Sequence, residues 1–220
     1  VGLDEPGQLA ATYGREACER AMGRIGERVA SVLRERDHVA RIDGTRFAVA
    51  LAPARRMDLE AVIQVAGRIR AALGEPFSVD AMTVYLSASV GFCLTGRAPE
   101  RSGASVLAAA EIALEHAQRN GPGAIRAYSA DMGRAALERD ALRDQVEGAL
   151  ENGEIVAYFQ PQLSTDTGDV AGFEALARWQ HPTRGILVPS DFLPAVLSAG
   201  LGERLGEVML GHALSAIRAW

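Results

Sequence analysis

The sequence predicts an α/β fold in which helices pack against a central sheet, followed by the opening elements of a second domain. Helical and strand-like hydrophobic periodicities alternate along residues 14–129 in the order helix, hairpin, helix, strand, helix, strand. An alternation of this kind places helices on the faces of a sheet. A charged helical stretch then separates this region from a new set of strand-like segments, and the 220 residues exceed what one small domain needs.

The first region begins with apolar residues at helical spacing, which predict an amphipathic helix over about residues 14–36. Segments 39–42 and 46–52 then alternate as strands do, and Asp43-Gly44 between them supplies the backbone conformation of a tight hairpin turn. Gly and Pro clusters bound the remaining elements. These are a helix over 57–73, a β-rich stretch over 83–92, a helix over 105–119 and a short edge strand over 125–128.

The rest of the chain predicts a linker helix over 130–152 and then new strands. A strand at 155–159, a polar turn at 164–169 and a segment at 171–180 precede a helix that begins near Phe192 and continues to Trp220. We therefore predict a first domain over 1–129, the linker helix, and a second domain over 153–220. We expect the first strand of the first domain to be truncated and the second domain to be incomplete.

The composition excludes several classes of function. The 28 acidic and 23 basic residues give a net charge of −5, so neither a nucleic acid polymer nor an anionic lipid surface is an expected partner. All the basic residues are arginine, which excludes chemistry that needs a lysine within these residues. Cys18 and Cys93 are isolated thiols, and no apolar run is long enough to cross a membrane, so we expect a cytoplasmic segment.

Four segments of the first region resemble the GGDEF domain, the family of diguanylate cyclases. The signature turn is Asp43-Gly44-Thr45-Arg46-Phe47, and a Tyr-Gly pair at 13–14 precedes the first helix. Leu-Ser-Ala-Ser-Val-Gly at 86–91 and Ala-Ala-Glu-Ile-Ala-Leu at 109–114 are similar to the family's S-x-G strand and AD-x-AL helix. The resemblance covers residues 1–129 and implies a central sheet flanked by helices.

In that family two carboxylates hold the metal ions that assist the condensation of two GTP molecules, since hard cations need oxygen ligands. The matching positions here are Gly2 and Thr45, and Arg46 stands where the family has a second acid. The resemblance therefore implies a degenerate domain without diguanylate cyclase activity, and GTP is not an expected ligand. Asp43 is either a hairpin corner or the remnant of a nucleotide site. The family's guanine and triphosphate contacts are also replaced, by Ala10, Glu19 and Gln118.

One feature of the family is retained, because Arg34 and Asp37 reproduce an R-x-x-D spacing five residues before the signature turn. In related cyclases this is the inhibitory site that binds the product, so the resemblance implies cyclic di-GMP as a candidate ligand. A guanidinium and a carboxylate can together read the edges of guanine. Arg68 and Arg70 are candidate additional contacts. The alternative is an exposed ion pair worth about 0.2–0.5 kcal/mol.

A second resemblance, to the EAL domain of cyclic di-GMP phosphodiesterases, covers the end of the chain. It rests on Tyr-Phe-Gln-Pro-Gln at 158–162 and on Glu-Ala-Leu-Ala-Arg at 174–178 with the residues around them. Glu174, Leu176 and Arg178 are two apart, so a strand places all three on one face, whereas a helix would make Glu174 and Arg178 a routine ion pair. Gly172 and Pro182 bracket the segment closely, and together with the resemblance they favour the strand.

The EAL resemblance implies the opening of a TIM-like barrel with metal-assisted phosphodiester hydrolysis. By that resemblance Glu174 is a ligand of Mg²⁺ or Mn²⁺, Arg178 contacts phosphate, Leu176 lines the nucleotide pocket and Gln160 is a polar ligand contact. The alternative for Gln160 is a structural amide at the end of a strand. The family's remaining metal ligands and its lysine lie beyond the equivalent of Trp220, so this chain is not expected to hydrolyse cyclic di-GMP by itself.

The combined resemblance predicts a tandem cyclic di-GMP signalling protein. Its inactive GGDEF module would regulate or dimerise an EAL phosphodiesterase, with Mg²⁺ or Mn²⁺ needed only by a complete EAL domain. The open apolar face of the partial barrel predicts a homodimer or a contact with the missing EAL remainder. The alternative is a receptor or scaffold without enzymatic activity, which is favoured where Leu197 stands in place of an acidic residue of the EAL pattern.

Overall fold

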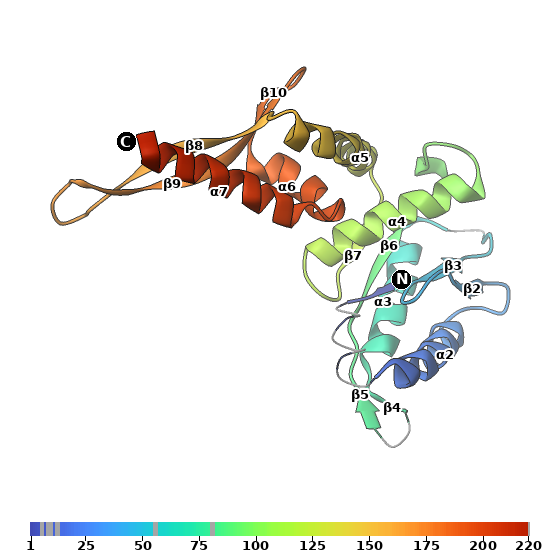
Figure 1. Cartoon of the computed structure of the whole chain (residues 1–220). Helices are drawn as coiled ribbons and strands as arrows, with labels where there is room; N and C mark the ends of the chain where they lie inside the picture. The colour runs from blue at the N-terminus through green and yellow to red at the C-terminus, as the bar shows by residue number, and fades with distance from the viewer. Residues whose placement is uncertain (5–6, 8–10, 12–13, 55–56, 80–81, 220) are drawn as a thin grey trace. The chain divides into compact units, whose positions relative to one another are not determined.

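The computed structural model describes residues 1–4, 7, 11, 14–54, 57–79 and 82–219 (Figure 1). It divides into two compact units, Val1–Gly133 and Arg134–Trp220. Each unit has its own buried apolar cluster, and each is therefore described by itself.

Unit 1 alternates helices with short strands, as the periodicities predict. Its elements are β1 (Gly2–Leu3), α2 (Arg15–Ser31), β2 (His38–Arg41), β3 (Phe47–Ala50), α3 (Leu59–Gly74), β4 (Phe77–Val79), β5 (Met82–Val84), β6 (Ala88–Phe92), a 3₁₀ turn (Thr95–Arg97), α4 (Gly103–Arg119), β7 (Ile125–Ala127) and the start of α5 (Ala130–Glu151).

The short strand β1 joins two parts of the sheet. It runs antiparallel to β6, with Gly2 opposite Ser89, and β6 runs parallel to β7. On its other side the backbone N–H of Phe47 donates to the carbonyl of Val1 at 2.8 Å, and the N–H of Leu3 donates to Thr45 at 3.2 Å. The β2–β3 hairpin therefore lies beside β1, and the strand order across the unit is β2, β3, β1, β6, β7.

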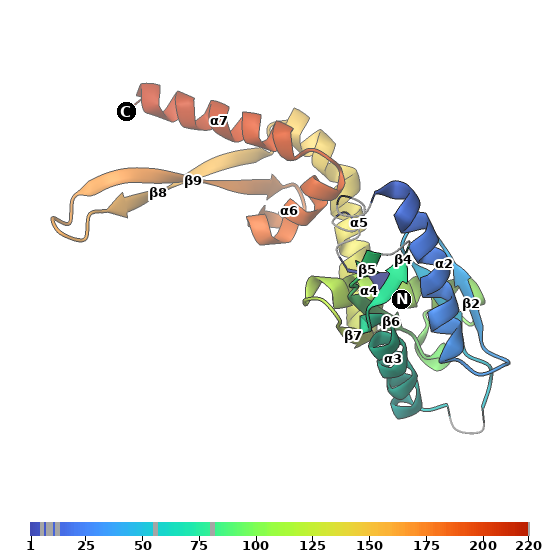
Figure 2. The same ribbon diagram turned by 90° about the horizontal axis from the view of Figure 1, so that it is seen from below.

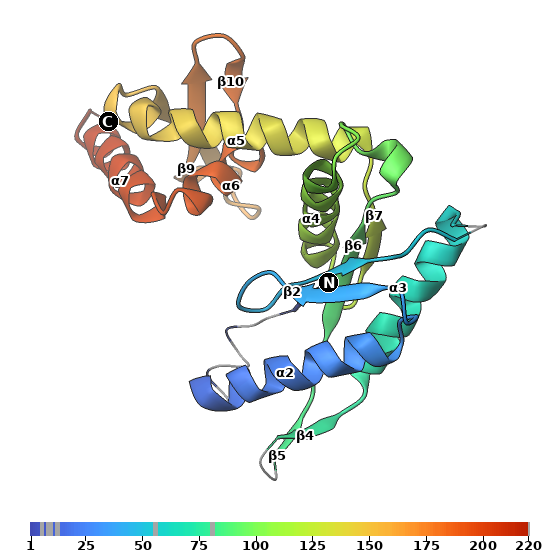
Figure 3. The same ribbon diagram turned by 90° about the vertical axis from the view of Figure 1, so that its right-hand side faces the viewer.

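Helices cover both faces of these strands (Figure 1, Figure 3). On one face α2 and α3 bury Ile25, Val29 and Leu73 against Leu3 and Phe47. On the other face α4 lies directly on β6. A Cβ atom built on Gly91 would lie 2.0 Å from the backbone nitrogen of Leu114, so only glycine allows this approach.

Unit 2 is a three-stranded antiparallel sheet with helices packed against it. The strands, in the order β10 (Gly185–Leu187), β9 (Val170–His181) and β8 (Ile155–Leu163), are accompanied by α6 (Pro189–Ser198) and α7 (Gly202–Ala219). The later turns of α5 contribute Val146 and Leu150 to the core, where Trp179 and Phe192 are fully buried. Figure 2 shows α7 running alongside the β8–β9 hairpin.

The structure confirms the mixed α/β class and the strand assignment of the Glu174 segment. It differs from the predicted elements in several places, and β4 (Phe77–Val79) is a strand that the sequence analysis does not predict. The β-rich stretch over 83–92 is divided into β5 (Met82–Val84) and β6 (Ala88–Phe92), with residues 85–87 between them. The final helix is broken into α6 and α7 at Gly200, whose φ is +72°. The loop between Pro182 and Pro189 contains the additional strand β10.

Candidate functional site

The signature turn of unit 1 is organised around the carboxylate of Asp43. Its Oδ1 accepts hydrogen bonds from the backbone N–H groups of Thr45 and Arg46, both at 3.2 Å, and its Oδ2 accepts one from the Arg46 Nε at 2.5 Å. The Arg46 hydrogen bond lowers the pKa of Asp43 below its usual value, while partial burial opposes that change. Arg46 also lies 3.7 Å from the Glu111 carboxylate on α4. The positive charge of Arg46 therefore offsets the negative charges of Asp43 in the turn and of Glu111 on α4.

Arg41 supports the same turn from strand β2. Its guanidinium donates to the backbone carbonyls of Asp43 and Gly44 at 2.9 and 2.7 Å, and it forms a bidentate pair with Glu19 at 2.8 and 3.1 Å. The hydrogen bond from Arg41 lowers the pKa of the exposed Glu19 carboxyl. Both oxygens of Glu19, the residue at the predicted guanine position, are therefore occupied by a structural partner.

The position of the first missing metal ligand, Gly2, is closely packed. A Cβ atom there would lie 3.0 Å from both Leu114 and the Gln118 amide, and Gln118 itself donates to the Leu3 carbonyl at 3.0 Å. Within the part of the chain that the structure describes, no three His, Cys, Asp or Glu side chains gather as a metal-binding group. The donor set at this turn does not fit the two-metal site of a diguanylate cyclase.

Asp4 is a site residue that the sequence analysis did not single out. Its carboxylate accepts hydrogen bonds from the hydroxyls of Ser87 and Ser89 at 2.7 and 2.8 Å and from the backbone N–H of Gly123 at 2.8 Å. It therefore ties the end of β1 to β6 and to the loop before β7. Two features of the sequence could have indicated this role. Asp4 comes directly after a strand, and Ser87 and Ser89 are two residues apart, so a strand places both hydroxyls on the same side.

The R-x-x-D residues lie at the loop after α2, where Asp37 has a structural role. Its Oδ2 accepts from the backbone N–H of Arg34 at 2.9 Å, and its Oδ1 accepts from that of Ala52 at 2.8 Å. Among the described residues, the exposed guanidinium of Arg34 has no ion-pair partner. On α3, Arg70 donates to the Gly123 carbonyl at 3.1 Å, whereas the side chain of Arg68 is exposed.

Asparagine in place of Asp37 is expected to remove an acid-sensitive part of the stability. The backbone N–H of Arg34, and secondarily that of Ala52, lowers the pKa of Asp37 below 3.8, against the opposing effect of burial. A depressed pKa gives stability that is present above pH 3.8 and is lost as the pH falls through the lower, folded-state value. Asp37→Asn should therefore destabilise unit 1 by about 1 kcal/mol near neutral pH and by nothing near pH 2. The urea concentration at the midpoint of unfolding, measured near neutral pH and near pH 2, reports this loss. The exposed Asp166→Asn is the control. An equal loss at both pH values would contradict it.

The β8–β9 hairpin of unit 2 brings the predicted EAL residues together. Gln160 is paired with Glu174 across the strands, and Tyr158 is paired with Leu176. Residues directly opposite one another share a face of an antiparallel pair, so these four side chains and Arg178 lie on one face of the hairpin. Gln160 and Glu174 are exposed, while Leu176 and Arg178 are half-buried.

Arg178 is positioned by its own strand. Its Nη1 donates to the Ala177 carbonyl at 2.7 Å, and its guanidinium carbon lies 5.9 Å from the centre of the Tyr158 ring, within the range of a cation–π contact. The face therefore offers a carboxylate, an amide and a guanidinium to one ligand. His181, by contrast, is buried and its Nε2 lies 2.8 Å from the Gln145 Oε1, which makes it a structural residue.

The remaining positions that the sequence analysis names lie outside the signature turn and the hairpin face. Leu197, at the departure from the EAL pattern, has 62% of its surface exposed on α6. Ala10 and Tyr13 lie outside the described residues. Within the residues that are described, no helix has the length and apolar character that crossing a bilayer requires.

Two curated relatives are similar to nearly the whole chain. The bifunctional diguanylate cyclase/cyclic di-GMP phosphodiesterase MucR of Pseudomonas aeruginosa is 28% identical over 209 residues, which are 94% of this chain and 30% of MucR. The cyclic di-GMP phosphodiesterase NbdA of the same organism is 30% identical over 219 residues, which are 100% of this chain and 28% of NbdA. The chain therefore spans less than a third of the length of either relative.

The structure and the family models agree with these relationships. The solved GGDEF domain of TpbB (YfiN) from Pseudomonas aeruginosa matches with a TM-score of 0.57 and 28% identity, over 62% of this chain and 78% of that one. Residues 143–220 match the EAL domain model, and residues 2–123 match the model described as diguanylate cyclase, GGDEF domain. Because the second match covers more than half of the chain, the chain belongs to the GGDEF family, with a match to the EAL domain behind the GGDEF domain.

Proposed function

We propose that the chain is part of a cyclic di-GMP signalling protein whose GGDEF unit makes no cyclic di-GMP and instead regulates or dimerises an EAL phosphodiesterase. The observation that carries this proposal is the replacement of metal-binding acids by a cation at the signature turn. The Arg46 guanidinium donates to Asp43 and lies beside Glu111, so its positive charge occupies the place where a catalytic turn would gather negative charge for divalent cations.

The packing at Gly2 bears on the same proposal. A Cβ atom at this position would lie 3.0 Å from the ends of the Leu114 and Gln118 side chains, which would have to give by a few tenths of an ångström. An acid restored at Gly2 would therefore need a small adjustment of both neighbours. The retained hairpin, with its Asp43 corner and its Arg41 support, is a structural feature of the module.

The hairpin face of unit 2 supports the phosphodiesterase part of the proposal. Glu174 offers hard oxygen donors that suit Mg²⁺ or Mn²⁺, and Arg178 carries a fixed charge that suits a phosphodiester. A metal ion bound there would supply an activated water for cleavage of one phosphodiester bond. The role of Gln160 would be to orient the nucleotide through its amide, and Leu176 would contact the apolar surface of the base.

Two measurements test the proposal. With Mg²⁺ and GTP, the chain is expected to form no cyclic di-GMP under conditions in which MucR, assayed beside it, forms it. In a longer form of the protein with a complete EAL domain, Glu174→Gln should lower hydrolysis of cyclic di-GMP to linear pGpG more than about 100-fold. The exposed Glu207→Gln on α7 is the matched control and should leave the rate unchanged. Synthesis of cyclic di-GMP, or full hydrolysis by Glu174→Gln, would overturn the corresponding half of the proposal.

The leucine at position 197, where the EAL pattern has an acidic residue, favours a second candidate, a receptor that binds cyclic di-GMP without cutting it. The longer form with a complete EAL domain distinguishes the phosphodiesterase from the receptor. A receptor would bind cyclic di-GMP by calorimetry and form no pGpG, and Arg178→Ala would weaken that binding. The R-x-x-D site is distinguished by Arg34→Ala, because Asp37 is engaged with the backbone and Arg34 supplies the available guanidinium.

A further inference from the structure

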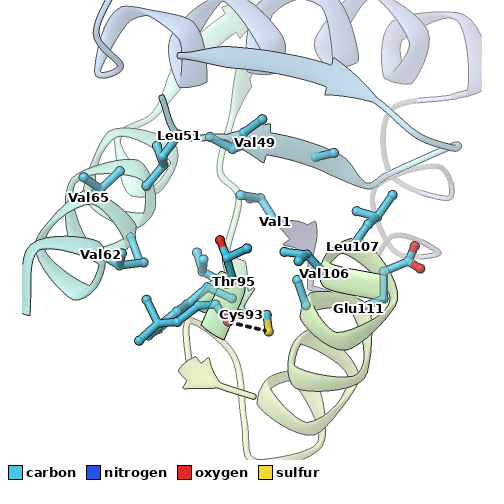
Figure 4. A pocket seen from close by; sticks show the side chains of 18 of the residues that line it. Val1, Val49, Leu51, Val62, Val65, Cys93, Thr95, Val106, Leu107 and Glu111 are labelled. Atoms are coloured by element: carbon cyan, nitrogen blue, oxygen red, sulfur yellow. Dashed lines mark hydrogen bonds between the residues drawn. The ribbon is translucent and has the colours of Figure 1, made fainter. Parts of the chain in front are cut away.

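Two arginines of the candidate sites differ in whether a carboxylate holds their charge. In unit 1 the Arg46 guanidinium lies against Asp43 and Glu111. Figure 4 shows Glu111 on α4, beside an apolar cavity of about 1080 Å³ between β3 and β6. In unit 2, by contrast, Arg178 forms no ion pair with any residue that the structure describes, although Glu174 lies on the same face of the hairpin. The charge of Arg178 is therefore available to an anionic ligand.

The strand geometry explains why Glu174 does not neutralise Arg178. The two residues are four positions apart on β9, and an extended strand holds their Cα atoms about 13 Å apart. Midway between them on the same face, Leu176 is paired with Tyr158 of β8. The order along the face is therefore carboxylate, aromatic ring and guanidinium, and the ring lies within reach of Arg178.

Tyr158 contacts Arg178 through its ring. The guanidinium carbon lies over the ring, 5.9 Å from its centre, where the negative face of the ring attracts a cation. The Tyr158 hydroxyl forms no hydrogen bond within the described part of the chain, and 42% of the residue is exposed, so Tyr158 is neither a core residue nor a hydrogen-bonded one. The Ala177 carbonyl accepts from Nη1 of the same guanidinium. These two contacts restrict a long, flexible side chain and leave its other N–H groups without a partner among the described residues.

We propose that Tyr158 is a positioning residue, whose ring holds the Arg178 guanidinium in place for a phosphate group of cyclic di-GMP. This role rests on the proposed function, which places that ligand on this face. A side chain that is already restricted loses less rotational freedom when the phosphate binds, so the ring strengthens binding without touching the ligand. A ring that stacked on a guanine base would instead strengthen binding directly, and would do so whether or not Arg178 is present.

A double-mutant cycle distinguishes positioning from direct contact, in the longer form with a complete EAL domain. Calorimetry without divalent metal measures the dissociation constant of cyclic di-GMP. Tyr158→Leu, which removes the ring, should raise this constant about two- to fivefold, and Tyr158→Phe, which keeps the ring, should leave it unchanged. In an Arg178→Ala background, Tyr158→Leu should have no further effect. Tyr85→Leu in unit 1, where 70% of the tyrosine is exposed, is the matched control.

The 220-residue chain supplies a second measurement that needs no ligand. The ring current of an aromatic side chain displaces the resonances of protons that lie over it. In Tyr158→Leu the Cδ proton resonances of Arg178 should therefore move toward their positions in the urea-unfolded chain, whereas Tyr158→Phe and Tyr85→Leu should leave them in place. Unmoved resonances in Tyr158→Leu would overturn the contact, and the positioning role with it.

The remaining outcomes separate this role from the proposed function. Equal weakening of binding by Tyr158→Leu with and without Arg178 would show that the ring binds the ligand directly, and would overturn the positioning role. Equal weakening by Tyr158→Leu and Tyr158→Phe would assign the effect to the hydroxyl and would also overturn it. If the unmodified longer protein binds no cyclic di-GMP, the proposed function fails, and the ligand part of this role fails with it even where the resonances confirm the contact.

Discussion

Gly91→Ala is expected to destabilise unit 1 by about 3 kcal/mol, one of the two largest effects predicted for this chain. The added Cβ atom would lie 2.0 Å from the Leu114 nitrogen, 2.4 Å from the Ala110 carbonyl oxygen and 2.5 Å from the Leu114 Cα. All three atoms belong to the backbone of α4, so no side-chain rotation can relieve the overlap. The helix would have to move away from β6, and its buried residues Ala109, Ala113 and Ala117 would lose their close contacts.

Urea unfolding followed by circular dichroism measures this loss, and amide exchange on α4 and β6 assigns it to unit 1. The matched control is Gly23→Ala on α2, where a Cβ atom would meet nothing within 4 Å. That change should stabilise the helix by about 0.5–1 kcal/mol, because alanine loses less backbone entropy on folding. A loss below about 1 kcal/mol for Gly91→Ala would mean that α4 can shift freely on the sheet.

Local patterns in the sequence predict most of unit 1. The Asp43-Gly44 dipeptide predicts the hairpin, and the amphipathic stretches predict α2, α3 and α4. The contact of Ser87 with Asp4 and the approach of α4 to Gly91 were not predictable in this way, because both join residues that are far apart in the chain. Ser87 bonds Asp4 across 83 positions, and the spacing of the two serines does not identify the acid that they bond.

For the candidate sites too, local sequence patterns predict one part and contacts between distant residues determine the rest. The sequence places Thr45 and Arg46 in the signature turn, but it does not show where the Arg46 guanidinium lies. In the structure Arg46 lies beside Glu111, a residue of α4 that is distant in sequence. The R-x-x-D spacing likewise could not reveal that the Asp37 carboxylate accepts a hydrogen bond from the backbone N–H of Ala52. Spacing identifies which side chains are present, whereas tertiary contacts decide which of them remain available.

The local sequence of the Glu174 segment allows both a helix and a strand, and tertiary contacts select the strand. Glu-Ala-Leu-Ala-Arg has high helix propensity, and a helix would satisfy Glu174 and Arg178 by pairing them with each other. The segment is a strand because β8 pairs with it along nine residues and because Trp179 must reach the core beneath α6. The same pairing leaves Glu174 exposed beside Gln160. The exposure of the face that carries Glu174 is thus a consequence of burying the opposite face of the hairpin.

Trp179→Ala is expected to have the largest effect in unit 2, a loss of about 3–5 kcal/mol. Trp179 has 1% of its surface exposed, and its ring meets Phe192 edge-on with the ring centres 5.9 Å apart. Its Nε1 donates to the Glu154 Oε2 at 2.9 Å, so truncation would leave both a large void and a carboxylate without its donor. Because Trp179 adjoins Arg178 on β9, the loss should also release the face that carries Glu174.

Trp179→Phe separates the two contributions, since it keeps an aromatic ring against Phe192 and removes only the indole N–H and part of the volume. It should destabilise unit 2 by about 1–2 kcal/mol. Amide exchange at Ile155 and Phe192 reports on unit 2, while exchange at Ile25 should be unchanged because that residue lies in the core of unit 1. Equal losses for the two variants would assign the stability to the Glu154 hydrogen bond. Packing against Phe192, the basis of the expected difference, would then contribute little.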